Sequence, residues 1–510
     1  MYDVIVIGAG VGGLSCAAQL ASLRKKVLIV EKIHHIGGTS HIFTRKKEGT
    51  YFFPMGPLSF SHPEFVNLML KDMGIKSTID FKRSHFQLIT PEIDIIYSKQ
   101  WEDFQKDLKD RFPQNAEGIE KLFGILKEII AAIKQIQDWH PEFTLLSDMK
   151  LGRKEIPEQY AKKLKIVEKY SEIPSKIVLD KYLANPTLKK LLGSQGTYEP
   201  VMNMIHLAFM WNLMSIEGIW YPSIGIHGIN DELSESIRRM NGDILLNSSV
   251  EEILVEDQKA FGVLLSNGKT YKAPWIVSNA DYKTTFLELI KPENVPVDHL
   301  QKVQNSAYTG SEICVYLSAD KNNVDLSKLR ADHLFYRHNM RFPSQNDKNI
   351  FDTKEIEICQ WSKKEPHSAP EGKISLILRA NMNFNTFSEW RTGIKKRKEG
   401  YDEYKRQLGY QLIKVVDNII PGLLNSHDIL DIATPLTYLD WGKRYKGSIA
   451  GWSRDLEKLE DFDKKILIKT PIDHLLVVGI YSFIEPFLGG YPVSMYSGKL
   501  AAEFIDRYWD

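Results

Sequence analysis

The sequence predicts an α/β protein with a nucleotide-binding parallel sheet, into which a second region of mixed sheet and helices is inserted. The chain opens with a strand, a glycine-rich turn, a helix of small residues and a second strand. It repeats the order strand, glycines and helix near its end, in LLVVGIYSFIEPFLGGYPVSMYSGKLAAEFI. Strands that alternate with helices in this way are typical of α/β folds.

The composition of the 510 residues is that of a globular protein, with 43% hydrophobic residues to form a core. Lys and Arg number 66 against 65 Asp and Glu. A chain this close to neutral has no general attraction for nucleic acid, and we expect no nucleic-acid partner.

The three cysteines, Cys16, Cys314 and Cys359, lie far apart and lack the spacing of metal ligands. We therefore expect no metal, no disulfide framework and a reducing, cytoplasmic location. The first residues, MYDVIVIGAG, enter a strand directly, and no run of eighteen apolar residues occurs. We expect neither a signal peptide nor a transmembrane helix.

The opening stretch DVIVIGAGVGGLSCAAQLASLRKKVLIVE is a dinucleotide-binding fingerprint of the Rossmann type. One glycine permits the tight turn, another lets the backbone approach a diphosphate, and another lets the helix pack closely on the sheet. The acid that ends the second strand is placed to bind a ribose. The predicted nucleotide-binding residues of this stretch are Gly8, Gly10, Gly12, Gly13, Glu31 and the following Lys32.

A second glycine pair, Gly37 and Gly38, follows the acidic strand end. This extension resembles that of the glutathione-reductase-like flavoproteins, in which such a pair lies against the diphosphate of FAD. The resemblance implies FAD as the cofactor, with Thr39 and Ser40 beside it. The alternative is that the two glycines form an ordinary turn.

The middle of the chain, residues 225–280, predicts a helix over 228–240 followed by short strands and a turn at Asn267-Gly268. The strand WIVSNA over 275–280 would return the chain to the parallel sheet. In FAD enzymes of this shape, the strand around Val250 approaches the adenine, and Asn279 follows the returning strand.

Several segments together resemble the phytoene desaturase, carotenoid isomerase and retinol saturase family of FAD-dependent oxidoreductases. They are FFPMGPLSFSHPEFVNLMLKDMGI, GIWYPSIGIHGINDELSESI, SNADYKTTFLELI and ATPLTYLDWGKRYKGSIAGW. The resemblance implies a glutathione-reductase-like FAD domain, a second domain for a long isoprenoid or polyene, and cofactor contacts at Gly56 and Pro57. Many relatives have Phe-Asp-x-Gly where this chain has Phe53-Pro54-Met55-Gly56, and Arg where it has Thr39.

The C-terminal turn would, by the same resemblance, close over the flavin. Its predicted cofactor contacts are Gly479, Gly489, Gly490, Pro492 and Val493. Glu485 and Tyr491 in the same loop are the candidate catalytic residues, with His227 as a further candidate. A carboxylate in a dry flavin pocket would have a raised pKa and could exchange a proton with the substrate. The alternative for Glu485 is a solvated loop residue.

We predict a discontinuous FAD domain over 1–75, 225–300 and 450–510, and a substrate domain over 76–224 and 301–449. The substrate domain begins with helices, in which Leu122, Leu126, Ile129, Ile133 and Ile136 recur at helical spacing, and its second part predicts a mixed sheet that roofs the pocket. Eleven bases against five acids over 150–190 indicate either a peripheral membrane contact through 120–220 or a solvated helical face.

The function predicted from these features is that of an FAD-dependent oxidoreductase that desaturates, saturates or isomerises a long apolar polyene or isoprenoid. One alternative is a flavin oxidase of the amine oxidase type, which GGYPVSMYSGKLAA would also suit. A second is a prenyl-lipid carrier without redox chemistry, similar to the GDP dissociation inhibitors.

Overall fold

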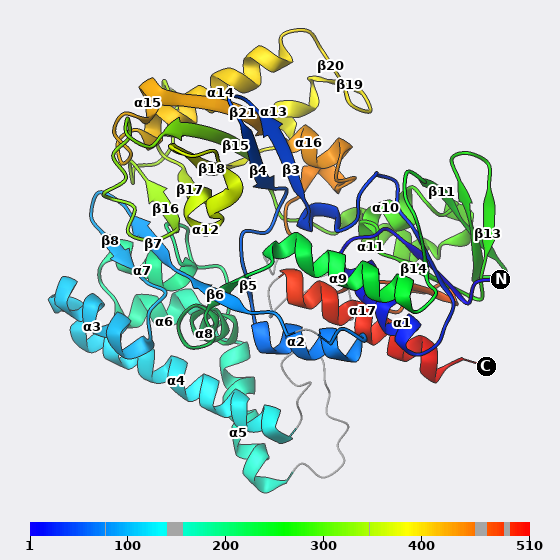
Figure 1. Cartoon of the computed structure of the whole chain (residues 1–510). Coiled ribbons are helices and arrows are strands. Elements are labelled where there is room, and N and C mark those ends of the chain that lie inside the picture. The colour runs from blue at the N-terminus through cyan, green and yellow to red at the C-terminus, as the bar shows by residue number, and fades with distance from the viewer. Residues whose placement is uncertain (77, 140–156, 346, 454–466, 484–489, 510) are drawn as a thin grey trace.

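The parallel sheet has five strands in the order β10-β2-β1-β14-β22. It lies on the side of the molecule where Figure 1 marks both chain termini and labels β14. The computed structural model describes residues 1–76, 78–139, 157–345, 347–453, 467–483 and 490–509. The four strands other than β10 are buried along their whole length, as their continuous apolar sequences require. The strands are β1 (Val4–Ile7), β2 (Val27–Val30), β10 (Asp243–Leu245), β14 (Trp275–Ser278) and β22 (Leu475–Val477).

Three distant parts of the chain meet in this sheet. β14 pairs in parallel with β1, so that Val4 lies opposite Trp275, and β22 pairs in parallel with β14. The returning strand and the C-terminal strand that the sequence predicts are therefore both present, which confirms the α/β fold class. The exact domain boundaries stay a prediction.

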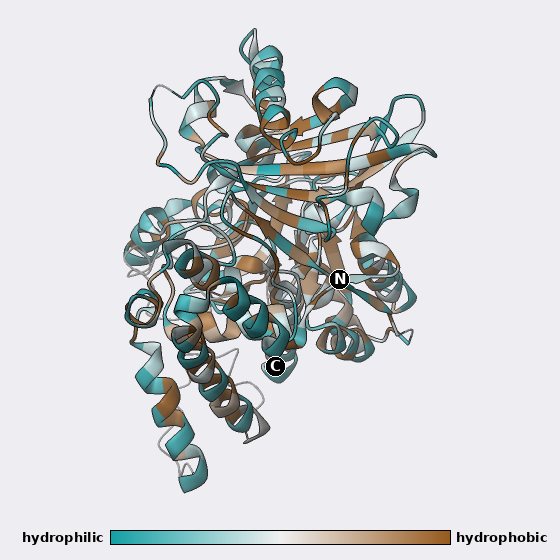
Figure 2. Cartoon of the chain, turned by 90° about the vertical axis from the view of Figure 1, so that its left-hand side faces the viewer, coloured by the Kyte–Doolittle hydropathy of each residue, from teal (hydrophilic) through white to brown (hydrophobic). Residues whose placement is uncertain are grey.

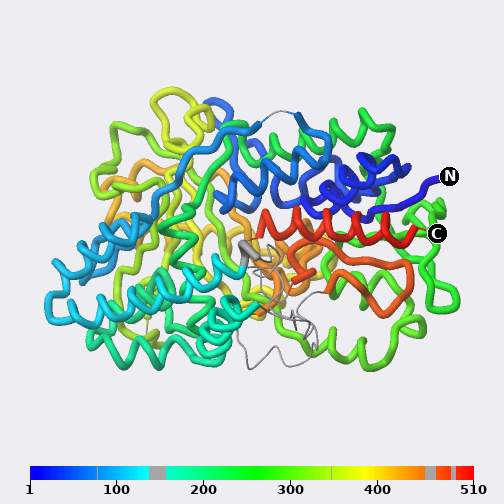
Figure 3. The backbone as a smooth tube through the Cα atoms, turned by 90° about the horizontal axis from the view of Figure 1, so that it is seen from below, coloured from blue at the N-terminus to red at the C-terminus, as the bar shows by residue number. Residues whose placement is uncertain are grey.

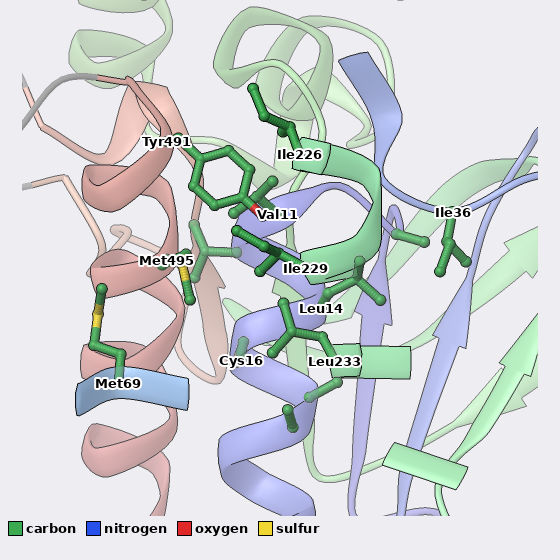
Figure 4. Packing of buried hydrophobic residues seen from close by; sticks show 14 of the residues in the cluster. Val11, Leu14, Cys16, Ile36, Met69, Ile226, Ile229, Leu233, Tyr491 and Met495 are labelled. Atoms are coloured by element: carbon green, nitrogen blue, oxygen red, sulfur yellow. The ribbon is translucent and has the colours of Figure 1, made fainter. Parts of the chain in front are cut away.

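Helix α1 (Val11–Ser22) lies between α9 (Gly225–Arg239) and the C-terminal helix α17 (Gly490–Arg507), as Figure 3 and Figure 4 show. Val11 and Leu14 of α1 face apolar side chains of α9, and Met495 of α17 packs on the other side (Figure 4). A Cβ atom at Gly498 of α17 would lie 2.3 Å from the carbonyl oxygen of Gly12. The small residues near the end of the sequence thus allow the two helices to touch.

A small antiparallel sheet, β11-β12-β13, flanks the parallel sheet where the sequence predicts short strands. Its last hairpin turns at Gly268, whose φ of +81° suits glycine. The strands are β11 (Val250–Glu256), β12 (Lys259–Leu265) and β13 (Thr270–Lys272).

The large sheet of the second region has seven strands in the order β21-β15-β18-β17-β16-β7-β8. It is mixed because β16 runs parallel to β7 while the other neighbours are antiparallel. The strands are β7 (Phe86–Ile89), β8 (Asp94–Ile96), β15 (Ser311–Asp320), β16 (His333–Arg337), β17 (Glu355–Gln360), β18 (Lys373–Met382) and β21 (His427–Ala433).

The predicted roof sheet is thus present, but β7 and β8 come from the first insertion, where the sequence analysis placed only helices. The two strands are short, and β7 is buried on both faces, so it shows no alternation of polar and apolar residues. Helix α14 (Tyr401–Val416) packs its apolar side chains with those of the large sheet, in the core that also contains Val315 and Leu378.

Helices of the first insertion form a second layer beside β7. The stripe from Leu122 to Ile136 on α4 is at most 2% exposed, so these residues belong to the core. In Figure 2 the strands at the centre of the molecule are largely brown, with teal positions between, and the outer helix faces are largely teal. The helices are α3 (Trp101–Arg111), α4 (Ala116–Trp139), α5 (Glu158–Ser171), α6 (Ser175–Tyr182), α7 (Pro186–Ser194) and α8 (Met204–Asn212).

The basic stretch over 150–190 is partly neutralised. Lys176 and Lys189 both pair with Asp180, at 3.0 and 2.8 Å. Residues 150–156 lie outside the described part of the chain. Among the described residues, no helix combines the length and the apolar character needed to cross a membrane.

A hairpin and a three-stranded sheet join the two regions. The hairpin brings Phe43 against Tyr316 of β15, with ring centroids 4.9 Å apart, and pairs Arg45 with Asp431 of β21. It therefore packs on the large sheet, although its sequence lies in the predicted FAD domain. The strands are β3 (Ile42–Lys46), β4 (Thr50–Pro54), β5 (Phe60–Ser61), β6 (Phe81–Ser84) and β9 (Ile219–Pro222).

Candidate active site

A cavity of about 1730 Å³ extends from the N-terminus of α1 to the inner face of the large sheet. Residues of both regions line it, so a molecule bound at the glycine-rich turn and one bound under the roof would share one space. The predicted residues that line it are Gly8, Gly10, Gly12, Glu31, Lys32, Gly37, Gly38, Thr39, Ser40, Gly56, Pro57, His227, Val250, Asn279, Gly479, Gly490 and Tyr491.

Five predicted site residues are not among the lining residues. Gly13 lies behind the turn, where a Cβ atom would meet the carbonyl oxygen of Gly8 at 2.1 Å. Pro492 and Val493 are buried in the first turn of α17, whose Gly490 and Ser494 do line the cavity. Glu485 and Gly489 lie outside the described residues.

The N-terminus of α1 fits a diphosphate. It opens on the cavity at Gly10 and Gly12, no side chain in the described part of the chain caps it, and its first turn carries no acidic residue. Its free N–H groups and the positive end of its dipole would favour an anion there. The observation that supports the FAD diphosphate at this place is therefore an uncapped helix end inside the cavity.

Glu31 ends β2 at the same edge of the sheet and is 5% exposed. One carboxylate oxygen accepts a hydrogen bond from the backbone N–H of Ala9 at 2.7 Å, and the other accepts one from Ile33 at 3.0 Å. Each oxygen keeps a free lone pair, so the carboxylate can also accept hydrogen bonds from ribose hydroxyls.

The second glycine pair lies directly against the first turn. The backbone N–H of Gly37 donates to the carbonyl of Ala9 at 2.7 Å. Asn230 of α9 donates to the carbonyl of Ser40 at 2.8 Å, and a Cβ atom at Gly37 would lie 2.5 Å from its amide nitrogen. The sequence analysis missed Asn230, which holds this loop in place.

Asn279 and Gly479 complete the nucleotide end of the cavity. Asn279 follows β14, and its backbone N–H donates to the carbonyl of Ile7. Its side chain packs among the glycines, because a Cβ atom at Gly10 or Gly479 would lie within 2.7 Å of its amide group. The backbones of two distant segments, the glycine-rich turn and the turn at Gly479, therefore converge on this one side chain.

Basic side chains surround the same end. Burial lowers the pKa of Lys32 to about 8, and the neighbouring Lys443 and Lys395 lower it further against the attraction of Glu31. Burial and the nearby His35 lower the pKa of His41 to about 4. His41 is therefore neutral at physiological pH, whereas Lys32 is mostly protonated and can neutralise a bound phosphate.

Of the candidate catalytic residues, Tyr491 holds a structural position at the cavity wall. Its hydroxyl donates to the side chain of Asn230 at 3.2 Å, and its ring stacks on Phe60 at 4.9 Å. Burial raises its pKa. His227 lines the cavity, and its buried Nδ1 has no hydrogen-bond partner among the described residues. It is free to bind a polar group of a ligand.

The sequence analysis missed a row of polar side chains on the cavity side of the large sheet. We call this the polar row: His333, Glu357, Arg379, Glu312 and Tyr438. Its last four members line the cavity. Alternation alone does not single these residues out, because Glu355 shares a strand face with Glu357, and Ser375 and Asn381 share one with Arg379.

Apolar side chains form much of the remaining wall under the roof. The Met-rich and aromatic segment VMNMIHLAFMWNLM supplies only its last two residues to this wall. Leu213 and Met214 line the cavity, whereas Met204 and Trp211 are fully buried among the helices. The apolar lining residues include Phe43, Phe60, Phe86, Leu213, Met214 and Ile219.

Comparison with known proteins relates most of the chain to flavoproteins. Residues 11–399 match the family model described as flavin-containing amine oxidoreductase. The chain is 26% identical to an Arabidopsis thaliana protein named prolycopene isomerase, chloroplastic, covering 90% of this chain and 76% of the relative. It is 25% identical to a Danio rerio protein named inactive all-trans-retinol 13,14-reductase, covering 99% and 85%.

The crystal structure of an oxidoreductase from Methanosarcina mazei matches with a TM-score of 0.62 and 17% identity, covering 97% of this chain and 99% of the other, which shows the shared fold. The relatives confirm the resemblance to the carotenoid isomerase and retinol saturase family, and the family match confirms FAD as the cofactor. The chain belongs to the flavin-containing amine oxidoreductases and is an FAD-dependent oxidoreductase.

Proposed function

We propose that this protein transfers hydride between FAD and a carbon of a long isoprenoid or polyene chain. The observation that carries the proposal is one continuous cavity, which joins the glycine-rich turn to a chamber under the seven-stranded sheet whose lining includes many apolar side chains. Relatives named all-trans-retinol 13,14-reductase and prolycopene isomerase support this class of substrate. When it is bound, FAD supplies hydride transfer to or from carbon.

The protein's own residues bind the substrate and exclude water. The side chains of Phe60, Phe86 and Met214 give an extended hydrocarbon apolar contact at about 25 cal/mol per Å² of buried surface. The hairpin residue Phe43 packs against Tyr316 and joins the roof to the nucleotide end. A dry chamber of this kind protects a reduced cofactor and a reactive polyene from side reactions.

The proposal is tested with the purified holoenzyme. Its visible absorption shows the bound flavin, and heat release followed by chromatography identifies it as FAD. Anaerobic mixing with a C20 or C40 polyene then bleaches the flavin if the protein desaturates its substrate. After chemical reduction of the flavin, the same polyene restores the oxidised spectrum if the protein saturates it. Flavin that stays unchanged in both directions, with no change in the isomer composition of the polyene, would exclude the proposal.

A second candidate substrate is an amine, because two carboxylates, Glu312 and Glu357, line the cavity and the family is described by amine oxidation. Anaerobic bleaching by an apolar primary amine, with no response to polyenes, would favour it. The amine ranks second because Arg379 lies between the two carboxylates and supplies an opposing positive charge.

A further inference from the structure

The segment 442–450, which follows α16 (Pro435–Asp440), lies along the nucleotide end of the cavity. We call this segment the strap. Most of it belongs to the predicted substrate domain, so this part of the second insertion reaches the place where the nucleotide would bind. Its residues that line the cavity are Gly442, Lys443, Arg444, Ile449 and Ala450.

Hydrogen bonds fix the strap to the region of the parallel sheet at two points. The backbone N–H of Tyr445 donates to the carboxylate of Asp281, which follows β14, at 3.2 Å. The buried hydroxyl groups of Ser448 and Tyr481 are hydrogen-bonded to each other at 2.8 Å. Tyr481 follows β22, the neighbour of β14, so the fold itself sets the position of the strap at the cavity.

The guanidinium group of Arg444 is held in place by three acceptors. One terminal nitrogen, Nη1, donates to the backbone carbonyl of Ser448 at 3.3 Å and to that of Ile449. The other, Nη2, donates to the hydroxyl of Thr39 at 3.0 Å. The strap thus anchors the guanidinium, and the Thr39 contact places it directly beside the second glycine pair.

Arg444 keeps hydrogen-bonding capacity that no described residue uses. Its Nε and one N–H of its Nη2 make no hydrogen bond in the described part of the chain. This Nε is accessible, in contrast to the Nε of Arg379, which is buried. Glu312 interacts with the charge of Arg444 only at longer range, and no carboxylate of the described residues forms an ion pair with Arg444. A fixed cation with free donors and no paired carboxylate favours an anionic ligand.

A diphosphate at the end of α1 would lie beside this cation. Gly38 precedes Thr39, and a Cβ atom at Gly38 would lie 3.4 Å from the Cα atom of Gly10, where α1 begins. Thr39, Gly10 and Arg444 all line the same cavity. The guanidinium and the free N–H groups of the helix are therefore within reach of one diphosphate.

The charge of a diphosphate requires such a partner. In FAD it carries about two negative charges, whereas the N-terminus of a helix offers only about half a positive charge. Lys32 supplies one cation at this end of the cavity, and Arg444 supplies a second. The Nε and Nη2 atoms share one edge of a guanidinium, where parallel N–H groups match two oxygens of a phosphate.

We propose that Arg444 binds the FAD diphosphate and thereby fastens the strap of the substrate region to the cofactor. FAD is then held by both regions of the protein, through the glycine-rich turns and through the strap. This inference goes beyond the proposed function, since it concerns the cofactor and holds for any substrate.

The test measures the binding of FAD, ADP and riboflavin to the full-length apoprotein. ADP contains the diphosphate without the flavin, and riboflavin contains the flavin without a phosphate. We expect Arg444→Gln to weaken the binding of FAD and of ADP at least about tenfold, because a charge-assisted hydrogen bond is lost, and to leave riboflavin binding unchanged. Weaker binding of riboflavin with unchanged binding of ADP would place Arg444 at the flavin and overturn the inference. Equal losses for all three ligands, or no loss, would overturn it as well.

Lys446→Gln is the matched control, because it removes a positive charge from the same strap but Lys446 is exposed and does not line the cavity. Its ADP affinity should stay within about twofold of wild type, and a tenfold loss would show that the general charge of the strap is responsible. The ADP affinity of wild type should also fall more steeply with salt than that of Arg444→Gln. If Arg444→Gln fails to fold, Arg444→Lys decides by the same comparison. It keeps the charge but not the fork, so we expect a smaller loss that is again confined to FAD and ADP.

Discussion

The carbonyl oxygen of Gly8 would lie 2.1 Å from a Cβ atom at Gly13. No side chain can approach a backbone oxygen so closely, so the helix can pack on the first strand only if residue 13 is glycine. The contact differs from that of Gly10, whose added Cβ would meet the end of the Asn279 side chain at 2.6 Å. An amide side chain can rotate away, whereas the backbone of a buried strand end cannot.

Gly13→Ala should therefore destabilise the fold much more than Gly10→Ala does. We expect a loss of about 3 kcal/mol or more in the free energy of unfolding for Gly13→Ala, since overpacking against the backbone strains the core. Gly10→Ala should keep the fold and lose FAD affinity. Chemical denaturation of the apoprotein and FAD titration separate the two effects. Equal stability losses would show that the turn is more adaptable than its geometry indicates.

Gly498→Ala should loosen the contact between α17 and α1. Its Cβ would lie 2.3 Å from the carbonyl of Gly12 and 2.6 Å from the backbone nitrogen of Cys16. We expect faster proteolysis of the C-terminal helix and a lower melting temperature. Gly124→Ala in α4 is the control, because no atom of the residues that the structure describes lies within 4 Å of its added Cβ. It should stabilise the protein by about 0.5 to 1 kcal/mol, as alanine favours helices.

The nucleotide end could be predicted from the sequence because its chemistry is local. The turn, the acid after β2 and the second glycine pair lie close together in the sequence. Each glycine there indicates a tight turn or a close approach of the backbone, which can be predicted without knowing the tertiary structure. The polar row could not be assembled in this way. Glu312, Glu357 and Arg379 come from three strands whose order and register are set by tertiary pairing, and their shared face appears only once β17 and β15 flank β18.

The free energy of unfolding should fall at acid pH because Glu357 of the large sheet becomes protonated there. Its pKa in the folded protein, about 2, lies below its ordinary value of 4.5. A carboxyl group with a lowered pKa stabilises the fold above its unfolded pKa and loses this effect as the pH falls through the folded value. Glu357→Gln should therefore lower the free energy of unfolding at pH 7 by about 3 kcal/mol and weaken its dependence on pH between 4.5 and 2.

Denaturation curves at pH 7 and at pH 3 measure this effect. Glu117→Gln is the control, since Glu117 forms only an exposed pair with Lys121 and should change neither curve measurably. An unchanged acid response in Glu357→Gln would mean that another group controls the acid sensitivity of the fold.

The three cysteines should be unreactive in the folded protein. Cys16, Cys314 and Cys359 are all fully buried and free, and burial raises the pKa of each thiol. The thiolate is the reactive form, and it is both scarce and inaccessible here. A chromogenic disulfide reagent should titrate none of them in native holoenzyme and three per chain in denaturant. Rapid reaction of one thiol before unfolding would reveal local opening of the sheet or of α1.

Tyr491→Phe tests whether Tyr491 acts in catalysis or in packing. Its hydroxyl donates a hydrogen bond to the side chain of Asn230, which in turn donates one to the carbonyl of Ser40. Its ring stacks on Phe60. The variant keeps the stack and loses one buried hydrogen bond, so we expect a stability loss of about 1 kcal/mol and flavin turnover within a fewfold of wild type. A proton donor would behave otherwise, with turnover falling by a hundredfold or more at unchanged stability and FAD occupancy. The rate of the anaerobic flavin half-reaction and the melting temperature of the variant, measured together, therefore distinguish packing from catalysis. A large loss of the half-reaction rate in a fully stable variant would identify Tyr491 as the catalytic acid.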